Sequence, residues 1–544
     1  MVATTDPYAT SVGVGVLRAG GNAVDAAVAV SFALAVVNPE AGNIGGSGFL
    51  VLRTQNGDDA ALDFRSQAPS GAAREMYLDS GGAVSEHAMI GALSAAVPGS
   101  VMGMWEAHRR FGRRPWEELL DPALELADGF EVKPHFLRSF TPGVVDRLRR
   151  FPGSAGIFLP AGGPPTPGTR FSQPELRRTL ERIRGRGPEG FYAGETAELI
   201  VAEMRRSGGI ITHEDLAAYR AVWREPVRFR YRGHSFLSVP PPSSGGVTLG
   251  ETAHILERFP LGELPWHGSA HIHLLAEAWR RAFADRNHYL ADPDFVPMPL
   301  ETLNSSEYGA WRALDISMDA ASRSSEVTPG GESYLRTAAS GGSRGSPADT
   351  GHTTHYSIVD GRGNAAAVTT TLNSWYGSKL VVGEAGFLLN NEMDDFAAKP
   401  GAPNQFGLIQ GEANAIAPGK RMLSAMAPTI VLDPQGRLFL VVGSPGGPTI
   451  ITTVFQVISN VVDHGMALGP AVLAPRVHHQ HLPDQVVHER GGLPQEVVKA
   501  LERLGHSLLE REEPIGDVQA VMRLRDGTLL GQSDPRRGGA AIGL

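Results

Sequence analysis

The junction between His352 and Thr353 is where the residue types in this sequence first suggest chemistry. Residues 321–352 are rich in Gly, Ser, Thr and Pro and contain little to bury, which predicts a flexible linker. From Thr353 onward, "TTHYSIVD" alternates like a core strand. A threonine at the N-terminus of a chain carries its own base, the α-amino group, and cleavage before Thr353 would create such a nucleophile. The junction alone leaves open the ordinary alternative of a linker that leads into a strand.

Other motifs of catalytic or ligand-binding appearance are weaker. Residues 341–345, "GGSRG", match a nucleophile elbow in letters only, because no strand or helix pattern flanks them. "GVGVLRAGG" has Arg18 in place of a third dinucleotide-binding glycine. The clustered histidines lack the spacing of known metal motifs, so packing is the default interpretation for His271, His273, His478, His479 and His481. With no cysteine in the chain, thiolate chemistry is excluded, and the sequence predicts neither a metal nor a cofactor.

The elements around the junction predict an α+β fold. "GGNAVDAAVAVSFALAVV" indicates a buried helix, and Asn56-Gly57 between two apolar runs favours a β-hairpin. Thr212 and Asp215 have the spacing of a capping box. Because strand pairs and helices occur on both sides of Thr353, we expect stacked antiparallel sheets covered by helices.

Composition limits the classes of partner. The 544 residues are 42% hydrophobic, enough for a large core, and the net charge of −9 comes from interspersed acidic and basic residues. That pattern argues against nucleic acid or anionic lipid as a partner. The apolar run 26–37 is too short to span a bilayer. Met1 is followed by polar residues without a signal-peptide core, so the sequence as it stands predicts a cytoplasmic protein, or a periplasmic or secreted one if a leader has been removed.

Over nearly its whole length the chain resembles γ-glutamyltransferases (γ-glutamyltranspeptidases) of the N-terminal nucleophile hydrolase superfamily. The resemblance rests on "GGNAVDAAVAVSFALAVVNPEAGNIGGSGF", "LDFRSQAP", "PPPSSGG", "YLADPDF", "TTHYSIVD" and "SDPRR". It implies a four-layer αββα sandwich. It also implies a precursor that cuts itself into a large subunit, 1–352, and a small subunit, 353–544, which stay together as one intertwined domain.

The same resemblance implies roles for individual residues. Thr353 in "TTHYS" matches the nucleophile, with Thr354 the weaker choice. Thr371 in "TTTLNSWYG" matches the threonine that hydrogen-bonds the nucleophile. Gly446 and Gly447 in "GSPGG" match the pair whose N–H groups form the oxyanion hole.

Substrate-binding residues are implied in the same way. Arg65 in "LDFRSQAP" matches the residue that binds the glutamyl α-carboxylate, a task suited to its planar fork. The remaining matches are Asn373, the α-ammonium acceptors Glu392 and Asp395 in "NNEMDDF", and Ser424 in "RMLSAMAP".

Two further features concern specificity and access. The family typically has two adjacent serines where this chain has Ser424-Ala425, so one hydroxyl is missing and we expect altered recognition rather than its loss. "KPGAPNQFGLIQGEAN" resembles the lid loop of some members, with Phe406 at its tip, although a static surface loop fits this segment nearly as well.

The expected activity is transfer of a γ-glutamyl group from glutathione or a related compound to water, an amino acid or a peptide, through a Thr353 acyl-enzyme and without a cofactor. The two subunits are expected to associate as a heterodimer. One alternative is a glutaryl or cephalosporin acylase on the same scaffold. The other is an unprocessed, non-catalytic binding protein.

Overall fold

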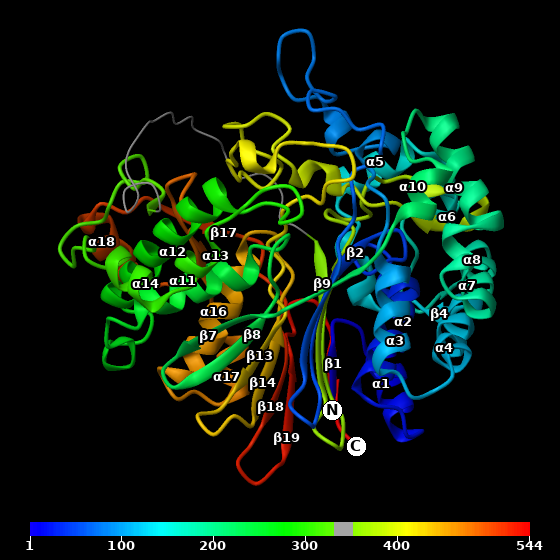
Figure 1. The fold of residues 1–544 in the computed structure, drawn as a ribbon. Helices are drawn as coiled ribbons and strands as arrows, with labels where there is room; N and C mark the ends of the chain where they lie inside the picture. Colours follow the sequence, from blue (N-terminus) through cyan, green and yellow to red (C-terminus); the bar gives the residue numbers. More distant parts are fainter. Residues whose placement is uncertain (331–351) are drawn as a thin grey trace.

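Two antiparallel sheets lie face to face between two layers of helices (Figure 1). The computed structural model describes residues 1–330 and 352–544. Strands β9 and β10 of the first sheet contact β14 of the second, so the two sheets share one interface. This is the predicted αββα sandwich, and the fold prediction is confirmed.

The first sheet has seven strands and is antiparallel throughout. In spatial order they are β20 (Ala540–Ile542), β1 (Val2–Thr4), β9 (Thr353–Val359), β10 (Ala365–Thr371), β2 (Ser47–Arg53), β3 (Asp59–Phe64) and β6 (Val222–Arg224). The strand that begins at Thr353 therefore lies inside the sheet, between β1 and β10.

The second sheet has six strands. In spatial order they are β19 (Leu529–Ser533), β18 (Gln519–Arg523), β14 (Leu438–Gly443), β13 (Thr429–Leu432), β8 (His234–Ser238) and β7 (Val227–Tyr231). Shorter strands lie outside both sheets, namely β4 (Phe130–Glu131), β5 (Arg170–Phe171), β11 (Val381–Val382), β12 (Phe387–Leu388), β15 (Val477–His478), β16 (Val486–Glu489) and β17 (Leu508–Arg511).

Helices cover the outer face of each sheet (Figure 1). On the side of the first sheet are α1 (Pro7–Arg18), α2 (Ala23–Val37), α3 (Ser100–Phe111), α4 (Trp116–Asp128), α5 (Pro142–Arg149), α6 (Pro152–Phe158), α7 (Pro174–Arg186), α8 (Glu189–Tyr192), α9 (Gly194–Ser207) and α10 (His213–Ala218). On the side of the second are α11 (Gly245–Leu256), α12 (Ser269–Tyr289), α13 (Leu300–Leu303), α14 (Ser306–Arg312), α16 (Thr449–Val462), α17 (Leu468–Leu473) and α18 (Gln495–Leu504).

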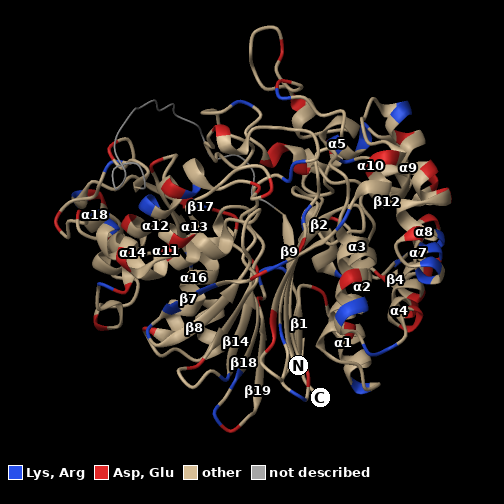
Figure 2. Cartoon of the chain, in the orientation of Figure 1, with Lys and Arg blue, Asp and Glu red and all other residues tan. Residues whose placement is uncertain are grey.

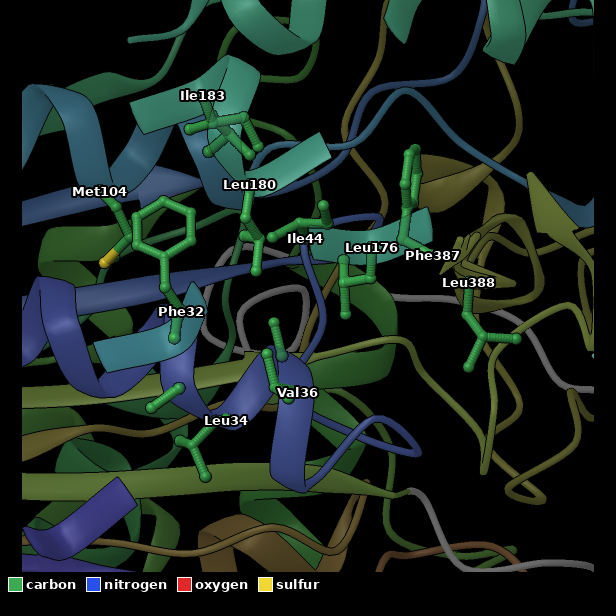
Figure 3. Packing of buried hydrophobic residues seen from close by; sticks show 14 of the residues in the cluster. Phe32, Leu34, Val36, Ile44, Met104, Leu176, Leu180, Ile183, Phe387 and Leu388 are labelled. Atoms are coloured by element: carbon green, nitrogen blue, oxygen red, sulfur yellow. The ribbon is translucent and has the colours of Figure 1, made fainter. Parts of the chain in front are cut away.

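Helix α2 shows why the sequence folds this way. It is apolar on nearly every side, and every residue except Ser31 is buried, because it lies between the first sheet and further helices. Its Phe32 and Val36 belong to the same buried cluster as Leu180 of α7 and Phe387 of β12 (Figure 3). An Asn22–Asp25 capping box fixes the start of α2.

Several local predictions are confirmed. The hairpin of β2 and β3 turns at Gly57, whose φ of +90° suits glycine. Thr212 and Asp215 form the expected capping box at α10.

The linker prediction needs correction at its N-terminal end. Residues 321–330 pack onto the protein, and the Ser324 N–H donates to Asp484 at 2.8 Å. Residues 331–351 of the predicted linker, with the "GGSRG" motif, lie outside the described residues.

Charge is distributed over the outside of the molecule without a large region of one sign on the helices in view. Figure 2 shows basic and acidic positions intermingled on α7 and α9, where the charged residues are arginines and glutamates. In residues 1–330 and 352–544, no helix has the combination of length and apolar character that crossing a bilayer requires.

Candidate active site

Thr353 lies at the first position of β9, directly opposite Thr371, the last residue of β10. The two hydroxyl oxygens are 3.1 Å apart. Both side chains are buried, so the hydrogen bond is protected from competing water. The pairing of two strands therefore fixes the contact that the sequence assigns to these threonines.

Strand alternation distinguishes Thr353 from its neighbour. His355 and Ser357, two and four residues along β9, bond within the interface between the sheets, where the Ser357 hydroxyl donates to the Gln519 carbonyl at 2.9 Å. Thr353 shares that face, because side chains two apart point the same way. The Thr354 methyl group instead lies near Gly42, at the end of α2. The structure thus places Thr353, and not Thr354, on the face with Thr371.

Both backbone groups of His352, the residue before Thr353, are hydrogen-bonded. The His352 N–H donates to the Asn373 carbonyl at 3.0 Å, and the Thr371 hydroxyl donates to the His352 carbonyl at 3.2 Å. The Asn373 N–H donates to the Thr371 hydroxyl at 2.8 Å. Since Thr371 uses its one proton on His352, the Thr353 hydroxyl is left to donate to Thr371.

Gly446 and Gly447 form the turn between β14 and α16. Their φ values are +137° and +56°, and a Cβ on Gly446 would come within 2.3 Å of the Thr449 hydroxyl. Among residues 1–330 and 352–544, neither glycine N–H has an acceptor. Gly447 lines the same cavity as Thr353, so this turn can present donors to a developing oxyanion.

Arg65, at the end of β3, is the centre of a buried charge cluster. Its guanidinium donates to Glu392 at 2.8 Å and also to Asp395, while its Nε donates to the Met422 carbonyl at 3.3 Å. Burial raises the pKa of both carboxyl groups, and Arg65 opposes that rise. The expected partners of a substrate carboxylate and ammonium thus already contact one another.

A cavity of about 30 Å³ brings most of these residues together. The predicted residues in its lining are Arg65, Thr353, Thr371, Asn373, Asp395, Ser424 and Gly447. His352 and Gly446 line a larger adjoining cavity of about 900 Å³, while Glu392 contacts Arg65 without lining either. The small cavity has room for little more than a water molecule, so binding an amino acid requires part of its wall to move.

Phe406 forms part of the wall between the two cavities and is buried. Its loop is held by the Gln480 amide, which donates to the Phe406 carbonyl at 3.1 Å, and by a bridge between Pro403 and Ile409. In this conformation the loop covers the small cavity, as a lid would.

A family profile described as "Gamma-glutamyltranspeptidase" matches residues 9–544. The chain belongs to the γ-glutamyltranspeptidase family. Glutathione hydrolase proenzyme of Escherichia coli is 44% identical, covering 98% of this chain and 90% of the relative, and that of Pseudomonas aeruginosa is 45% identical, covering 100% and 94%. The crystal structure of cephalosporin acylase from Bacillus halodurans superposes with a TM-score of 0.85 at 27% identity, covering 99% of this chain and 94% of that one.

Membership in the γ-glutamyltranspeptidase family makes this protein an enzyme, and the non-catalytic alternative is set aside. The family resemblance did not point to every residue at the site, however. Arg286 of α12 lines the small cavity and donates to the Ser244 hydroxyl at 3.0 Å. Burial lowers its pKa to about 10, so it remains cationic at neutral pH. The sequence signal that could have identified Arg286 is the presence of an arginine within the apolar pattern of α12.

The histidines also have structural partners. His478 bonds Thr452 at 2.8 Å and Gln480 at 2.9 Å. Within the described residues, the one group with metal-like geometry is His273, Glu277 and His506. Its rings bond each other at 2.8 Å, and Glu277 pairs with both Arg280 and Arg281. Two guanidinium groups already neutralise this carboxylate, so the cluster suits a cation poorly.

Proposed function

We propose that this enzyme is a self-processing γ-glutamyl acyltransferase and hydrolase that acts on glutathione or a related γ-glutamyl compound. The observation that supports this most directly is the cavity shared by Thr353, Arg65 and Asp395. A nucleophile beside one cation and one anion suits an acyl group that carries both an α-carboxylate and an α-ammonium. The glutamyl group has both.

The contacts around His352 support self-cleavage before Thr353. The Thr353 hydroxyl attacks the His352 carbonyl carbon, polarised by the Thr371 hydroxyl at 3.2 Å. An ester bond forms to Thr353 Oγ, the peptide C–N bond breaks, and the hydroxyl proton ends on the Thr353 nitrogen. Water then hydrolyses the ester, which leaves a carboxylate on His352 and a free amine and hydroxyl on Thr353.

Turnover uses the same atoms. The Thr353 α-amine takes the proton as Thr353 Oγ attacks the γ-carbonyl, and the N–H groups of Gly446 and Gly447 stabilise the oxyanion. Arg65 binds the α-carboxylate, Glu392 and Asp395 accept from the α-ammonium, and Asn373 and Ser424 help to orient the glutamyl group. The acyl-enzyme then passes its glutamyl group to water or to an amino acid or peptide.

The charges at the site also separate this activity from its nearest alternative. A glutaryl or cephalosporin side chain lacks the α-ammonium and would leave Asp395 and Glu392 without that partner. Ala425 in the cavity lining and the structural similarity to a cephalosporin acylase favour the alternative. Sequence identity of 44–45% to glutathione hydrolase proenzymes outweighs them.

Mass measurement and N-terminal sequencing of the purified protein test the proposal. We expect two fragments, the smaller beginning at Thr353, and one uncut chain for Thr353→Ala. Thr354→Val is the matched control, because Thr354 lies on the opposite face of β9, and it should cleave normally. The cleaved protein should hydrolyse γ-glutamyl-p-nitroanilide in preference to glutaryl-p-nitroanilide. An uncut wild type rules out self-processing, and the reverse preference favours the acylase.

A further inference from the structure

Trp375 lies against the residue that precedes the proposed cleavage site. Its ring stacks on the His352 imidazole, with ring centroids 3.6 Å apart and an angle of 12° between the planes. Both residues are buried, His352 at 4% exposure and Trp375 at 9%. None of the roles assigned above uses this contact.

Arg537 joins the same contact to the nucleophile. Its guanidinium lies 5.0 Å from the centre of the Trp375 ring and donates to the Thr353 carbonyl at 3.3 Å. Arg138 donates to the Arg537 carbonyl at 2.7 Å and lies 5.8 Å from the same ring centre. Trp375 and Arg537 therefore contact each other and hold the two residues on either side of the scissile bond.

The loop that carries Trp375 is fixed in place. Asn373 and Tyr376, on either side of it, have φ values of +84° and +59°, which non-glycine residues rarely adopt. The Tyr376 N–H donates to the Glu40 carbonyl at 2.9 Å, and its hydroxyl bonds Ser139 at 2.9 Å. Surrounding contacts hold the backbone in this strained conformation, which fixes the point from which the indole projects.

We propose that Trp375 is a positioning residue for self-cleavage, which clamps the His352 side chain so that the His352 carbonyl stays within reach of the Thr353 hydroxyl. This inference rests on the self-processing proposed above. It adds a requirement at His352, namely a flat side chain that can stack.

A clamp on His352 is needed because the two residues of the scissile bond are held to different degrees. Thr353 is fixed by β9, but His352 precedes the strand and is held by its two backbone hydrogen bonds, to Asn373 and from Thr371. Stacking restricts rotation about the His352 backbone, and attack on a carbonyl is sensitive to small errors of position. Trp375 also lines the cavity of about 900 Å³, so cleavage gives the released His352 carboxylate an adjoining space.

Cleavage kinetics of the full chain made by cell-free synthesis test the clamp. Samples quenched over time are separated under denaturing conditions to follow the loss of uncut chain. Trp375→Leu and His352→Ala should each slow cleavage roughly three- to tenfold, the range expected from an aromatic contact. Trp375→Phe and His352→Phe keep a planar ring and should stay within about twofold of wild type.

The double variant Trp375→Leu/His352→Ala separates a clamp from a general packing role. If the two rings act through each other, it should cleave no more slowly than the slower single variant. Rates that multiply, or a His352→Ala chain that cleaves as fast as wild type, overturn the inference and leave self-processing intact. A wild type that never cleaves overturns self-processing itself. If Trp375→Leu fails to fold, the His352 pair decides alone, because it leaves the 373–376 loop unchanged.

Discussion

Arg65 has one set of contacts in this structure and would take another in the proposed reaction. In the uncut chain it satisfies Glu392 and Asp395, two carboxylates in a buried site. Removing one member of such a cluster leaves an uncompensated charge, which is strongly destabilising. In the proposed mechanism, the substrate α-carboxylate binds Arg65 and the substrate α-ammonium binds the two carboxylates. The cluster therefore keeps its charges compensated before and after binding.

Ala425 gives a prediction about affinity. It lines the small cavity beside Ser424, where the family typically has a second serine. Ala425→Ser should lower the KM for γ-glutamyl-p-nitroanilide about fivefold, because one added neutral hydrogen bond contributes about 1 kcal/mol. Steady-state kinetics of the cleaved enzyme measure this. Ala217→Ser, on the exposed side of α10, is the control and should change nothing. A KM that Ala425→Ser leaves unaltered shows that position 425 does not contact the substrate.

At the scale of an element, the 3₁₀ turn η7 (Glu392–Asp395) links the charge cluster around Arg65 to the loop that carries Phe406. Asp394, the third residue of this turn, is buried and accepts from the Gln405 N–H at 3.4 Å, next to Phe406. Burial, reinforced by the neighbouring Asp395, raises the pKa of Asp394 to about 8. Asp394 is therefore protonated at neutral pH, where it contacts the loop that carries Phe406.

A pH dependence follows from this carboxyl. The folded state holds the Asp394 proton up to about pH 8, whereas the unfolded chain loses it near 3.8. Between these values the unfolded state binds fewer protons, so the free energy of unfolding falls as pH rises, by up to about 1.4 kcal/mol per pH unit. Asp394→Asn cannot titrate and should flatten the curve in this window.

Thermal unfolding from pH 5 to pH 8 measures the effect, with Thr353→Ala in every sample to keep the chain uncut. The Tm of the parent chain, relative to the chain with Asp394→Asn, should fall steadily across the window. Asp319→Asn, at an exposed position, should run parallel to the parent chain. Parallel curves for Asp394→Asn as well would mean that Asp394 titrates normally in the folded protein.

Elements with local signals could be predicted from sequence, and those fixed by distant contacts could not. The turn at Asn56-Gly57 and the capping box at Thr212 depend on neighbours in the chain, so short windows reveal them. Residues 321–330 are as polar as the rest of the predicted linker, yet the Ser322 N–H donates to Glu277, which belongs to α12. The role of Trp375 could not be predicted for the same reason, because its stacking on His352 depends on how β9 and β10 pair.

At the scale of the whole molecule, the parts of the chain before and after the proposed cleavage site are interleaved. Strand β1 of the N-terminal part lies between β20 and β9 of the C-terminal part, and β10 pairs with β2. In the second sheet, β8 pairs with β13 across the same division. Within the described residues, four strand pairings therefore join residues before the proposed cleavage site to residues after it.

These pairings predict that cleavage leaves one particle. Separating the parts would expose backbone donors and acceptors on several strands, together with the apolar interface between the sheets. The free-energy cost of that exposure is far larger than the entropy gained when one peptide bond is cut. Backbone hydrogen bonds and apolar contacts are also insensitive to salt, so about 1 M NaCl, which shortens the screening length to about 3 Å, should not divide the particle. Urea should divide it, because urea solvates both peptide and apolar groups.

Size-exclusion chromatography with light scattering measures the native mass of the fully cleaved protein beside uncut Thr353→Ala. The two masses should agree in low and high salt, and denaturing gels of the same peak should show two fragments in one sample and one chain in the other. Separate peaks in high salt would mean that charge pairs, rather than the shared sheets, hold the two parts together. One peak in every salt condition assigns that role to the strands, because β1 cannot leave its place between β9 and β20 without unpairing on both edges.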